Sequence, residues 1–340
     1  MPINPYEENF LMATTTYSNL SQRTNAFAAK EMLAHAEPIA CLSKFGMVKP
    51  MPKNKANQVK FRRPVPLAVA TTPLTEGSAP TSLALAYEDV SVTLAQLGAV
   101  VEITDVVNDL GEDPVLKDAA MMCGEQAMET IETLMWGVLQ GGTNVFYANG
   151  SARNAVNTVI TLNKQRAITR QLKGNRGKKI TQMLASSVKF NTVAVAPAFI
   201  GFAHTDLESD IRGLAGFTPT EQYGSMEALP YEIGKVEDVR YILTPVLSSI
   251  ANGGGSAGSM VSTGGSAADV YPVVYCAKDS YGSVSLKGSD AMTPYIRNPG
   301  QIDSADPLGQ KGTVGWKTYH KSFIANQSWL CRLECSATAL

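Results

Sequence analysis

Hydrophobic and polar residues alternate in two stretches in the first third of the chain. Apolar side chains fall mostly on alternate positions from residue 59 to 69 and again from 90 to 94. Such alternation predicts β-strands that bury one face. Pro64 and Pro66 lack a backbone donor, so the first strand does not suit a sheet centre. Residues 71–82 between the strands are rich in turn-forming residues, which predicts a long projecting hairpin whose base rests on another part of the protein.

The segment before this hairpin has little regular pattern. Residues 1–58 contain five prolines, and only residues 26–37 have a helical composition before Pro38 ends the stretch. We therefore expect an N-terminal arm rather than part of a core.

Residues 113–140 carry the clearest helical pattern. Asp113 is a good N-cap, Pro114 suits the first helical position, and the glycine pair 141–142 provides the stop. At about 1.5 Å per residue this helix is about 40 Å long. Apolar residues recur at spacings of three and four along one face, at Leu116, Ala120, Cys123, Ala127, Ile131, Leu134 and Val138.

The opposite side of the same helix is acidic. Asp118, Glu125, Glu129 and Glu132 form a stripe there, and Trp136 lies along the same side. An acidic stripe is typical of a solvated helix face, whereas a large exposed aromatic side chain favours a contact surface. The pattern leaves both interpretations open.

The next helical segment is basic. Residues 162–173 predict a short helix ended by Gly174, on which Arg166, Arg170 and Lys173 form a positive stripe. Such a stripe suits phosphate groups or the carboxylates of a neighbouring protein. Aromatic residues do not interleave with it, so stacking on nucleic-acid bases is not indicated.

Beyond residue 190 the pattern is that of a mixed α/β region. Thr205 and Glu208 form a capping box that opens a short helix over 206–212. Residues 248–269 contain six glycines and many serines, which predicts a flexible surface loop. Strands are expected at residues 193–200, 239–243, 270–277, 283–286 and 314–335.

Composition changes this picture mainly through charge. The 340 residues suffice for about two domains, and a content of 44% hydrophobic residues indicates a globular protein. The formal net charge of −1 is the sum of +5 for residues 1–63, −11 for 64–150, +9 for 151–190 and −4 for 191–340. The near-zero total argues against a protein that coats nucleic acid or a membrane with its whole surface. The segregation reflects either which faces are solvated or complementarity between acidic and basic surfaces.

No constellation of residues predicts catalysis, a cofactor or a metal centre. The three histidines are far apart, the glycine triplet at 253–255 lacks the residues of a phosphate-binding loop, and there is no GxSxG motif. The main alternative is a soluble α/β enzyme or nucleotide-binding protein with a site near His204, Asp206 and Asp210. A decoration or portal protein is a third alternative, although portals are predominantly helical and this chain is rich in predicted strands. The simpler interpretation is that residues of this cluster cap a helix.

The spacing of the cysteines and the length of the apolar runs indicate the cellular compartment in which the protein is made. Five cysteines without a CxxC pair indicate reduced thiols. No signal-like start and no apolar run of 18 residues is present, so we expect a protein made in a cytoplasm, soluble there and not membrane-bound.

The order of these elements resembles the major capsid proteins of tailed double-stranded DNA bacteriophages, whose fold is shared with herpesvirus shells. In particular the sequence is similar to the coat proteins of Enquatrovirus-type podoviruses. The segments that carry this resemblance lie between residues 60 and 317. They are PLTEG at 73–77, QLGAVVEITD at 96–105, HTDLESDIR at 204–212, GFTP at 216–219, GKVEDVRYI at 234–242 and GWK at 315–317.

The resemblance implies an α+β capsid fold in five parts. These are an N-terminal arm (1–58), an extended E-loop hairpin (59–104), a peripheral domain (105–190) with a spine helix (113–140), an axial domain (191–300) and a C-terminal return to the peripheral domain (301–340). It further implies hexamers and pentamers that form an icosahedral head around DNA, with the E-loop of one subunit over a neighbour's peripheral domain. The implied partners are other copies of the chain, a portal, scaffolding or decoration proteins, and packaged double-stranded DNA bound without sequence preference. The implied location is the virion, assembled in the host cytoplasm, with no catalytic residue and no cofactor.

Charge segregation suggests how subunits could choose their register. We expect the acidic stripe to meet basic residues of another segment, either those at 60–63 or those of the basic helix. A competing expectation is that the basic helix faces DNA. The candidate interface residues are Lys60, Arg62, Arg63, Glu76, Asp118, Glu125, Glu129, Glu132, Trp136, Arg166, Arg170 and Lys173.

Overall fold

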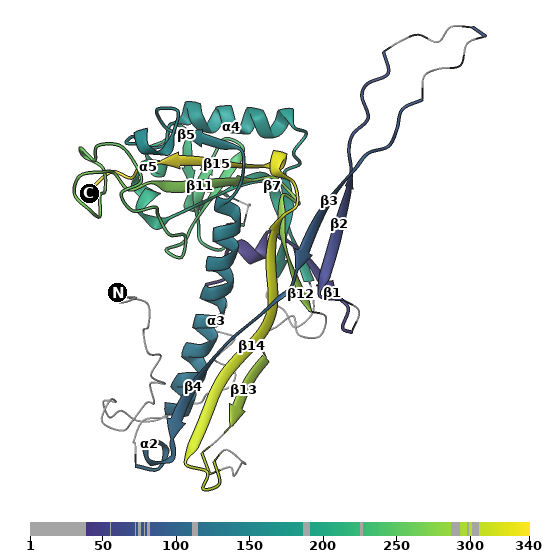
Figure 1. Cartoon of the computed structure of the whole chain (residues 1–340). Coiled ribbons are helices and arrows are strands. Elements are labelled where there is room, and N and C mark those ends of the chain that lie inside the picture. The colour runs from purple at the N-terminus through teal and green to yellow at the C-terminus, as the bar shows by residue number, and fades with distance from the viewer. Residues whose placement is uncertain are drawn as a thin grey trace, which may run out of the picture.

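Two β-sheets, one long helix and a projecting hairpin make up the protein (Figure 1). The computed structural model describes residues 39–110, 115–185, 191–224, 227–286, 293–297, 299–300 and 306–340, apart from residues 55, 72, 74, 75, 78, 80 and 81. The helix expected at 26–37 lies outside the described residues. The architecture is of the α+β class, as the resemblance implies.

A five-stranded sheet forms the elongated half of the molecule. Its central strand is β14 (Lys311–Ile324), which is antiparallel to β4 (Ala95–Thr104) along one edge. Along the other edge it pairs with β12 (Tyr281–Leu286) and β13 (Thr293–Arg297), and β1 (Met47–Met51) adds in parallel to β12. The helix α3 (Val115–Gln140) packs on this sheet through a core that includes Ile103, Ala127 and Trp316.

An eight-stranded sheet forms the other half. Its strands, in spatial order, are β5 (Val145–Tyr147), β15 (Leu330–Cys335), β11 (Tyr271–Cys276), β7 (Asn191–Ala203), β10 (Val239–Leu243), β9 (Glu232–Val236) and β8 (Phe217–Pro219), and β6 (Ile180–Ala185) also pairs with β7. Helices α4 (Leu162–Gly174) and α5 (Glu208–Arg212) pack on one face. The last turns of α3 pack on the other face, so α3 links the two sheets.

The buried face of α3 follows the predicted apolar stripe only over its first half. Ala120, Cys123 and Ala127 are buried as expected. Beyond them the helix leaves the five-stranded sheet and meets the other sheet from a different side. Met135 and Leu139 therefore enter the core, whereas the predicted core residue Leu134 is 45% exposed.

The hairpin has two paired strands as the alternation predicts, but the first ends at Pro64 rather than at residue 69, where prolines remove backbone donors. Strands β2 (Gln58–Pro64) and β3 (Tyr87–Thr93) are antiparallel, with Phe61 opposite Val90. The base of the hairpin rests on β14, where the Phe61 ring stacks on the Phe323 ring with their centroids 4.5 Å apart. Because β3 continues almost directly into β4, the hairpin is anchored in the five-stranded sheet.

The two halves exchange segments more than the expected domain boundaries allow. Only β14 of the C-terminal segment joins the five-stranded sheet, because β15 pairs with β11 in the other sheet. Strands β12 and β13, expected with the axial domain, belong to the five-stranded sheet. Helix α4 and strand β5, expected with the peripheral domain, belong to the eight-stranded half. Strand pairing thus joins segments on both sides of the expected boundaries at 190 and 300, and the five-part division stays a prediction of the resemblance.

The glycine-rich stretch 248–269 is a folded loop rather than the flexible one that its composition predicts. Bridges join Ile250 to Val270 and Ser256 to Ala267. The buried Asp269 carboxylate accepts hydrogen bonds from the backbone N–H of Asn252 at 2.8 Å and from the Thr263 hydroxyl at 2.6 Å. The glycines serve close backbone approach, since a side chain on Gly254 would lie 2.2 Å from the carbonyl oxygen of Val156.

A buried histidine at the middle of β14 makes stability depend on pH. His320 is 8% exposed, and its Nε2 lies 2.8 Å from the Ser322 hydroxyl. Burial, with a smaller contribution from Lys321, lowers the pKa of His320 to about 4. The unfolded chain takes up this proton near pH 6.5. The contribution of His320 to the free energy of unfolding is therefore fully present above about pH 6.5. It is lost as the pH falls toward 4, because only the unfolded chain takes up the proton in that range.

We expect the free energy of unfolding of the unassembled subunit to fall by about 2 kcal/mol from this group between pH 6.5 and 5. Urea titrations of the wild type and of His320→Gln at both pH values measure the effect. The variant should show a correspondingly shallower loss, and equal losses in both proteins would contradict the assignment.

Candidate assembly surfaces

The outer part of the hairpin carries exposed apolar side chains that the described residues leave uncovered. Leu67, Val69, Leu83, Leu85 and Tyr87 are between 53% and 79% exposed. Glu76 is the single charged residue among residues 65–86 and lies, also exposed, in the turn at the tip. Figure 1 shows this part of the hairpin standing clear of both sheets. An apolar surface of this kind is typical of a contact with another molecule.

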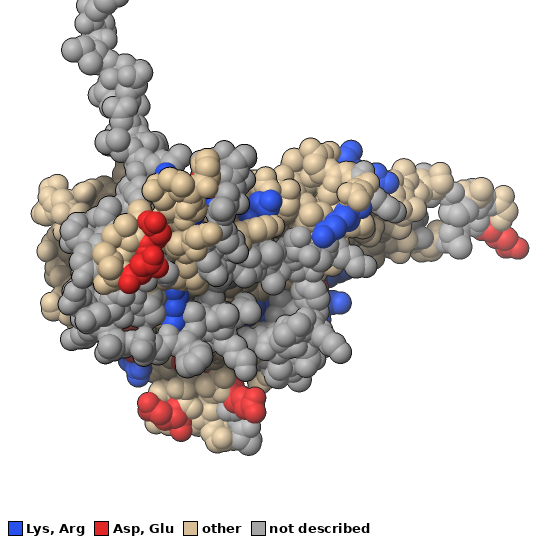
Figure 2. All heavy atoms as spheres, turned by 90° about the horizontal axis from the view of Figure 1, so that it is seen from below, with Lys and Arg blue, Asp and Glu red and all other residues tan. Residues whose placement is uncertain are grey.

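The basic residues at the hairpin base have partners within the hairpin itself. Arg62 Nε donates to Asp89 Oδ1 at 2.8 Å, and Arg63 pairs with Glu88 across the strands. The hydrogen bond from Arg62 holds the pKa of Asp89 below its usual range. Lys60 is exposed and lies opposite Ser91. In Figure 2 basic atoms lie on the hairpin close to the body and acidic atoms lie at its far end.

The predicted acidic stripe is split between solvent and core. Asp118 and Glu129 are exposed and Glu125 is half-buried. Glu132 is 1% exposed, so its expected place on a solvated face is wrong. Its two carboxylate oxygens accept the backbone N–H of Leu42 at 2.7 Å and that of Ser43 at 3.1 Å.

The short helical turn η2 (Leu42–Lys44) explains why Glu132 is buried. It lies against α3, and the Tyr281 hydroxyl donates to the carbonyl oxygen of Leu42 at 2.7 Å. Burial raises the pKa of Glu132, although the N–H groups of Leu42 and Ser43 oppose this shift. Glu132 therefore fixes the N-terminal segment on the spine helix rather than facing a neighbour.

Trp136 is also inside the protein. It is 1% exposed and packs between α3 and the eight-stranded sheet, and its Nε1 donates to the carbonyl oxygen of Ser248 at 3.2 Å. The expectation of an exposed aromatic side chain is wrong, because the second sheet covers this side of the helix.

The basic helix α4 finds its nearest counter-charges in a turn between β9 and β10. Arg166 Nε donates to Glu237 at 2.8 Å, Lys173 pairs with Asp238, and Lys179 Nζ lies 2.7 Å from the other Asp238 oxygen. Arg170 is exposed and makes no ion pair within the described part of the chain. The carboxylates at 237 and 238 were not among the candidates, since only the fold brings them to the helix.

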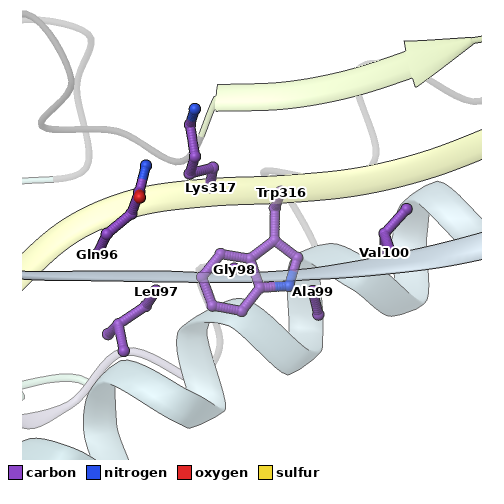
Figure 3. Close-up of a pocket in the computed structure, with 7 residues that line it drawn as sticks. All are labelled: Gln96, Leu97, Gly98, Ala99, Val100, Trp316 and Lys317. Carbon is purple, nitrogen blue, oxygen red and sulfur yellow. The ribbon is translucent and has the colours of Figure 1, made fainter.

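A shallow groove lies where β4 runs beside β14 (Figure 3). Trp316 and Leu97 point toward α3, and Trp316 Nε1 donates to Gln126 at 3.2 Å. Gln96, Val100 and Lys317 point away from the helix. On that side Val100 is 65% exposed and the Lys317 ammonium lies over the Tyr295 ring, 5.2 Å from its centroid.

Glycines keep the floor of this groove flat. Gly98 lies opposite Lys317 and Gly315 lies opposite Val100 in the β4–β14 register. A side chain on Gly98 would come within 2.7 Å of the Trp316 carbonyl oxygen. We call this face, which the described residues leave exposed, the uncovered face of the sheet. It combines a flat strip with the exposed apolar residues Val100 and Tyr295, a feature that was not predicted from the sequence. The alternation of Gly98 with its apolar neighbours was the only local signal.

The residues of the enzyme alternative have structural roles. His204 Nδ1 accepts the backbone N–H of Asp206 at 3.1 Å, and Asp206 accepts the Tyr271 hydroxyl at 2.8 Å. Asp210 accepts the backbone N–H of Thr338 at 3.0 Å and its hydroxyl at 2.7 Å, which holds the C-terminal tail. The enzyme alternative therefore has no support.

Other candidate chemistry can be stated for the described residues alone. They contain no group of three or more His, Cys, Asp or Glu side chains placed to hold a metal ion. All five cysteines are buried free thiols, and burial raises the pKa of Cys331 to about 12. None of the helices in the described ranges has the length and apolar character needed to cross a membrane.

Comparison with known structures gives the same fold. The chain is similar to the capsid of Ralstonia phage GP4, with 11% identity, a TM-score of 0.64, and coverage of 100% of this chain and 99% of the other. It is similar to the Cyanophage Pam1 capsid, with 13% identity, a TM-score of 0.60, and coverage of 96% and 99%. The head of Helicobacter pylori bacteriophage KHP40 matches with 13% identity, a TM-score of 0.55, and coverage of 99% and 98%.

Comparison of the sequence itself with curated proteins and with family models gives a match to one family. No curated protein matches the chain significantly. The family model described as phage capsid protein matches residues 87–322, well over half of the chain. The protein therefore belongs to the phage capsid protein family and is a structural component of a virion capsid, not an enzyme.

Proposed function

We propose that this protein is the major capsid protein of an Enquatrovirus-type tailed phage and that it forms hexamers and pentamers of an icosahedral head around double-stranded DNA. The observation that carries the self-assembly is the exposed apolar hairpin at 65–86, which a lone subunit would leave in water. The Enquatrovirus assignment rests on the sequence segments between residues 60 and 317 that the chain shares in order with that family.

Sedimentation of the purified full-length chain tests self-assembly. We expect a fast-sedimenting species whose negatively stained particles have hexagonal profiles. A stable monomer or a small ring under every assembly condition would contradict the proposal.

The hairpin fits the uncovered face of a neighbouring subunit's five-stranded sheet. Each arm of residues 65–86 is about 11 residues long and can reach about 35 Å when extended. The strip at Gly98 and Gly315 has the exposed apolar residues Val100 and Tyr295 beside it, between polar side chains such as Lys317, and so offers apolar contacts to the hairpin. Burial of both surfaces would add hydrophobic stabilisation at every subunit contact.

Fewer charged residues are left for contacts between subunits than the sequence predicts. Arg62, Arg63, Arg166 and Lys173 already pair within the chain. The exposed acids Asp118 and Glu129 make no such pair in the described residues, and neither does Lys60. We keep the hypothesis that complementary charges set how neighbouring subunits align, with the contact now between one of these acids and Lys60 of another copy.

We expect Asp118→Lys/Glu129→Lys to raise the subunit concentration needed for assembly by about three- to tenfold. An exposed ion pair contributes about 0–1 kcal/mol, and reversing the acid that meets Lys60 replaces this attraction with repulsion. Light scattering during assembly measures this concentration, and Lys60→Glu in the same chain should restore part of it. An unchanged threshold in the acidic double variant would contradict a role for the stripe.

The proposal extends to further partners and to the place of assembly. A portal and scaffolding or decoration proteins would act on the same shell, which would assemble in the bacterial cytoplasm. No residue of this chain is assigned to these partners.

A further inference from the structure

The surface formed by α4 and the loop after it is strongly basic. We call the seven cations of residues 164–179 the basic surface; they are Lys164, Arg166, Arg170, Lys173, Arg176, Lys178 and Lys179. All seven are exposed or half-buried. Helix α4 lies on the eight-stranded half, at the opposite end of the spine helix from α2 (Asp105–Leu110), the short helix that precedes the spine (Figure 1).

Two carboxylates neutralise only part of this surface. Glu237 and Asp238 hold Arg166, Lys173 and Lys179. Lys164, Arg170, Arg176 and Lys178 make no ion pair within the described residues, so the surface keeps five positive charges in excess. The adjacent Lys278 and Asp279 cancel each other and do not change this excess.

The basic surface has no apolar centre. Every exposed large hydrophobic side chain of the described residues lies outside the range 141–230. Interfaces between proteins usually have an apolar or aromatic core with charges at the rim. The basic surface therefore differs from the hairpin and from the β4 groove, which carry exposed apolar residues.

Its chemistry matches phosphate rather than bases. Guanidinium and ammonium groups bind phosphate oxygens through charge-assisted hydrogen bonds. The exposed cations follow a helix and its continuation for about 20 Å, at 1.5 Å per helical residue. Residues 164–179 themselves contain no aromatic side chain; the half-buried Trp329 beside them donates its Nε1 to the carbonyl oxygen of Asn175 at 2.9 Å.

We propose that the basic surface binds the phosphate backbone of double-stranded DNA without sequence preference. This inference rests on the proposed function, because it is the packaged DNA that such a surface would meet. In the shell, α4 would then face the interior.

Fluorescence anisotropy of the purified full-length protein with a labelled 20-base-pair duplex tests the proposal. The variant Lys164→Gln/Arg170→Gln/Lys178→Gln removes three unpaired cations. The control Lys44→Gln/Lys53→Gln/Lys321→Gln removes the same charge from other places on the chain. Dissociation constants are measured between 50 and 200 mM salt, and shell formation is followed separately by electron microscopy.

The slope of log K against log salt is negative, and each lost phosphate contact makes it less steep by about 0.9. We expect the first variant to lose about 2 to 3 in slope and to bind more than tenfold more weakly at low salt, while it still forms shells. The control should keep the wild-type slope. Equal losses in both variants would overturn the proposal, since net charge alone would then explain binding.

The competing hypothesis is that carboxylates of a neighbouring subunit bind to the basic surface. In that case the first variant keeps its DNA slope but fails to form shells, which overturns the DNA assignment and leaves the capsid function intact. Failure of the wild type to form shells, with the slope change as expected, would contradict the proposed function and not the DNA site.

Discussion

We expect the double substitution Leu83→Asp/Leu85→Asp to abolish the formation of closed shells while the subunit stays folded. The two side chains are 58% and 67% exposed and belong to no hydrophobic cluster of the described residues. Full burial of a leucine contributes about 1.5–3 kcal/mol, and an aspartate in its place would have to be desolvated. The loss recurs at every subunit contact, so its effect on the shell is large.

Sedimentation velocity measures the shells, and the thermal midpoint of the unassembled subunit measures its fold. The midpoint should change by no more than about 2 °C, because surface substitutions usually alter stability by about 0.5 kcal/mol or less. Leu340→Asp is the matched control, since Leu340 is fully exposed at the end of the chain and should leave assembly unchanged. Normal shells from the double variant would contradict the role of the hairpin.

The second large effect concerns the fold rather than assembly. We expect Glu132→Ala to lower the free energy of unfolding by about 2–4 kcal/mol, because it leaves the buried N–H groups of Leu42 and Ser43 without acceptors. Glu132→Gln should recover only part of this, since an amide presents one acceptor oxygen where the carboxylate presents two.

Urea unfolding of the unassembled subunit measures both variants. Glu129→Ala, one turn away on the exposed side of α3, is the control and should lie within about 0.5 kcal/mol of the wild type. If Glu132→Ala were as stable as this control, the attachment of the N-terminal segment through Glu132 would be wrong.

Local pattern was enough to predict the elements that depend on neighbouring residues. Alternation predicted the two paired strands of the hairpin, and apolar spacing predicted the buried positions of α3 as far as Ala127. The resemblance supplied the α+β capsid fold, which individual motifs could not.

Distant partners explain what local pattern missed. Glu132 meets backbone groups 90 and 89 positions earlier in the chain, and Arg166 meets a carboxylate 71 positions later. By its position along the helix, Trp136 falls on the acidic side of α3, which the sequence predicts to be solvated. The eight-stranded sheet covers it there. The groove at Gly98 arises only when β4 lies beside β14, over two hundred positions apart in the sequence.

A cryo-electron microscopy reconstruction of particles assembled from the full-length chain tests the central claim most directly. The account predicts a closed shell in which residues 65–86 of each copy lie against the uncovered sheet face of another copy, beside its Val100 and Tyr295. A reconstruction in which this hairpin stands free in solvent, or a preparation that yields only separate subunits, would contradict it.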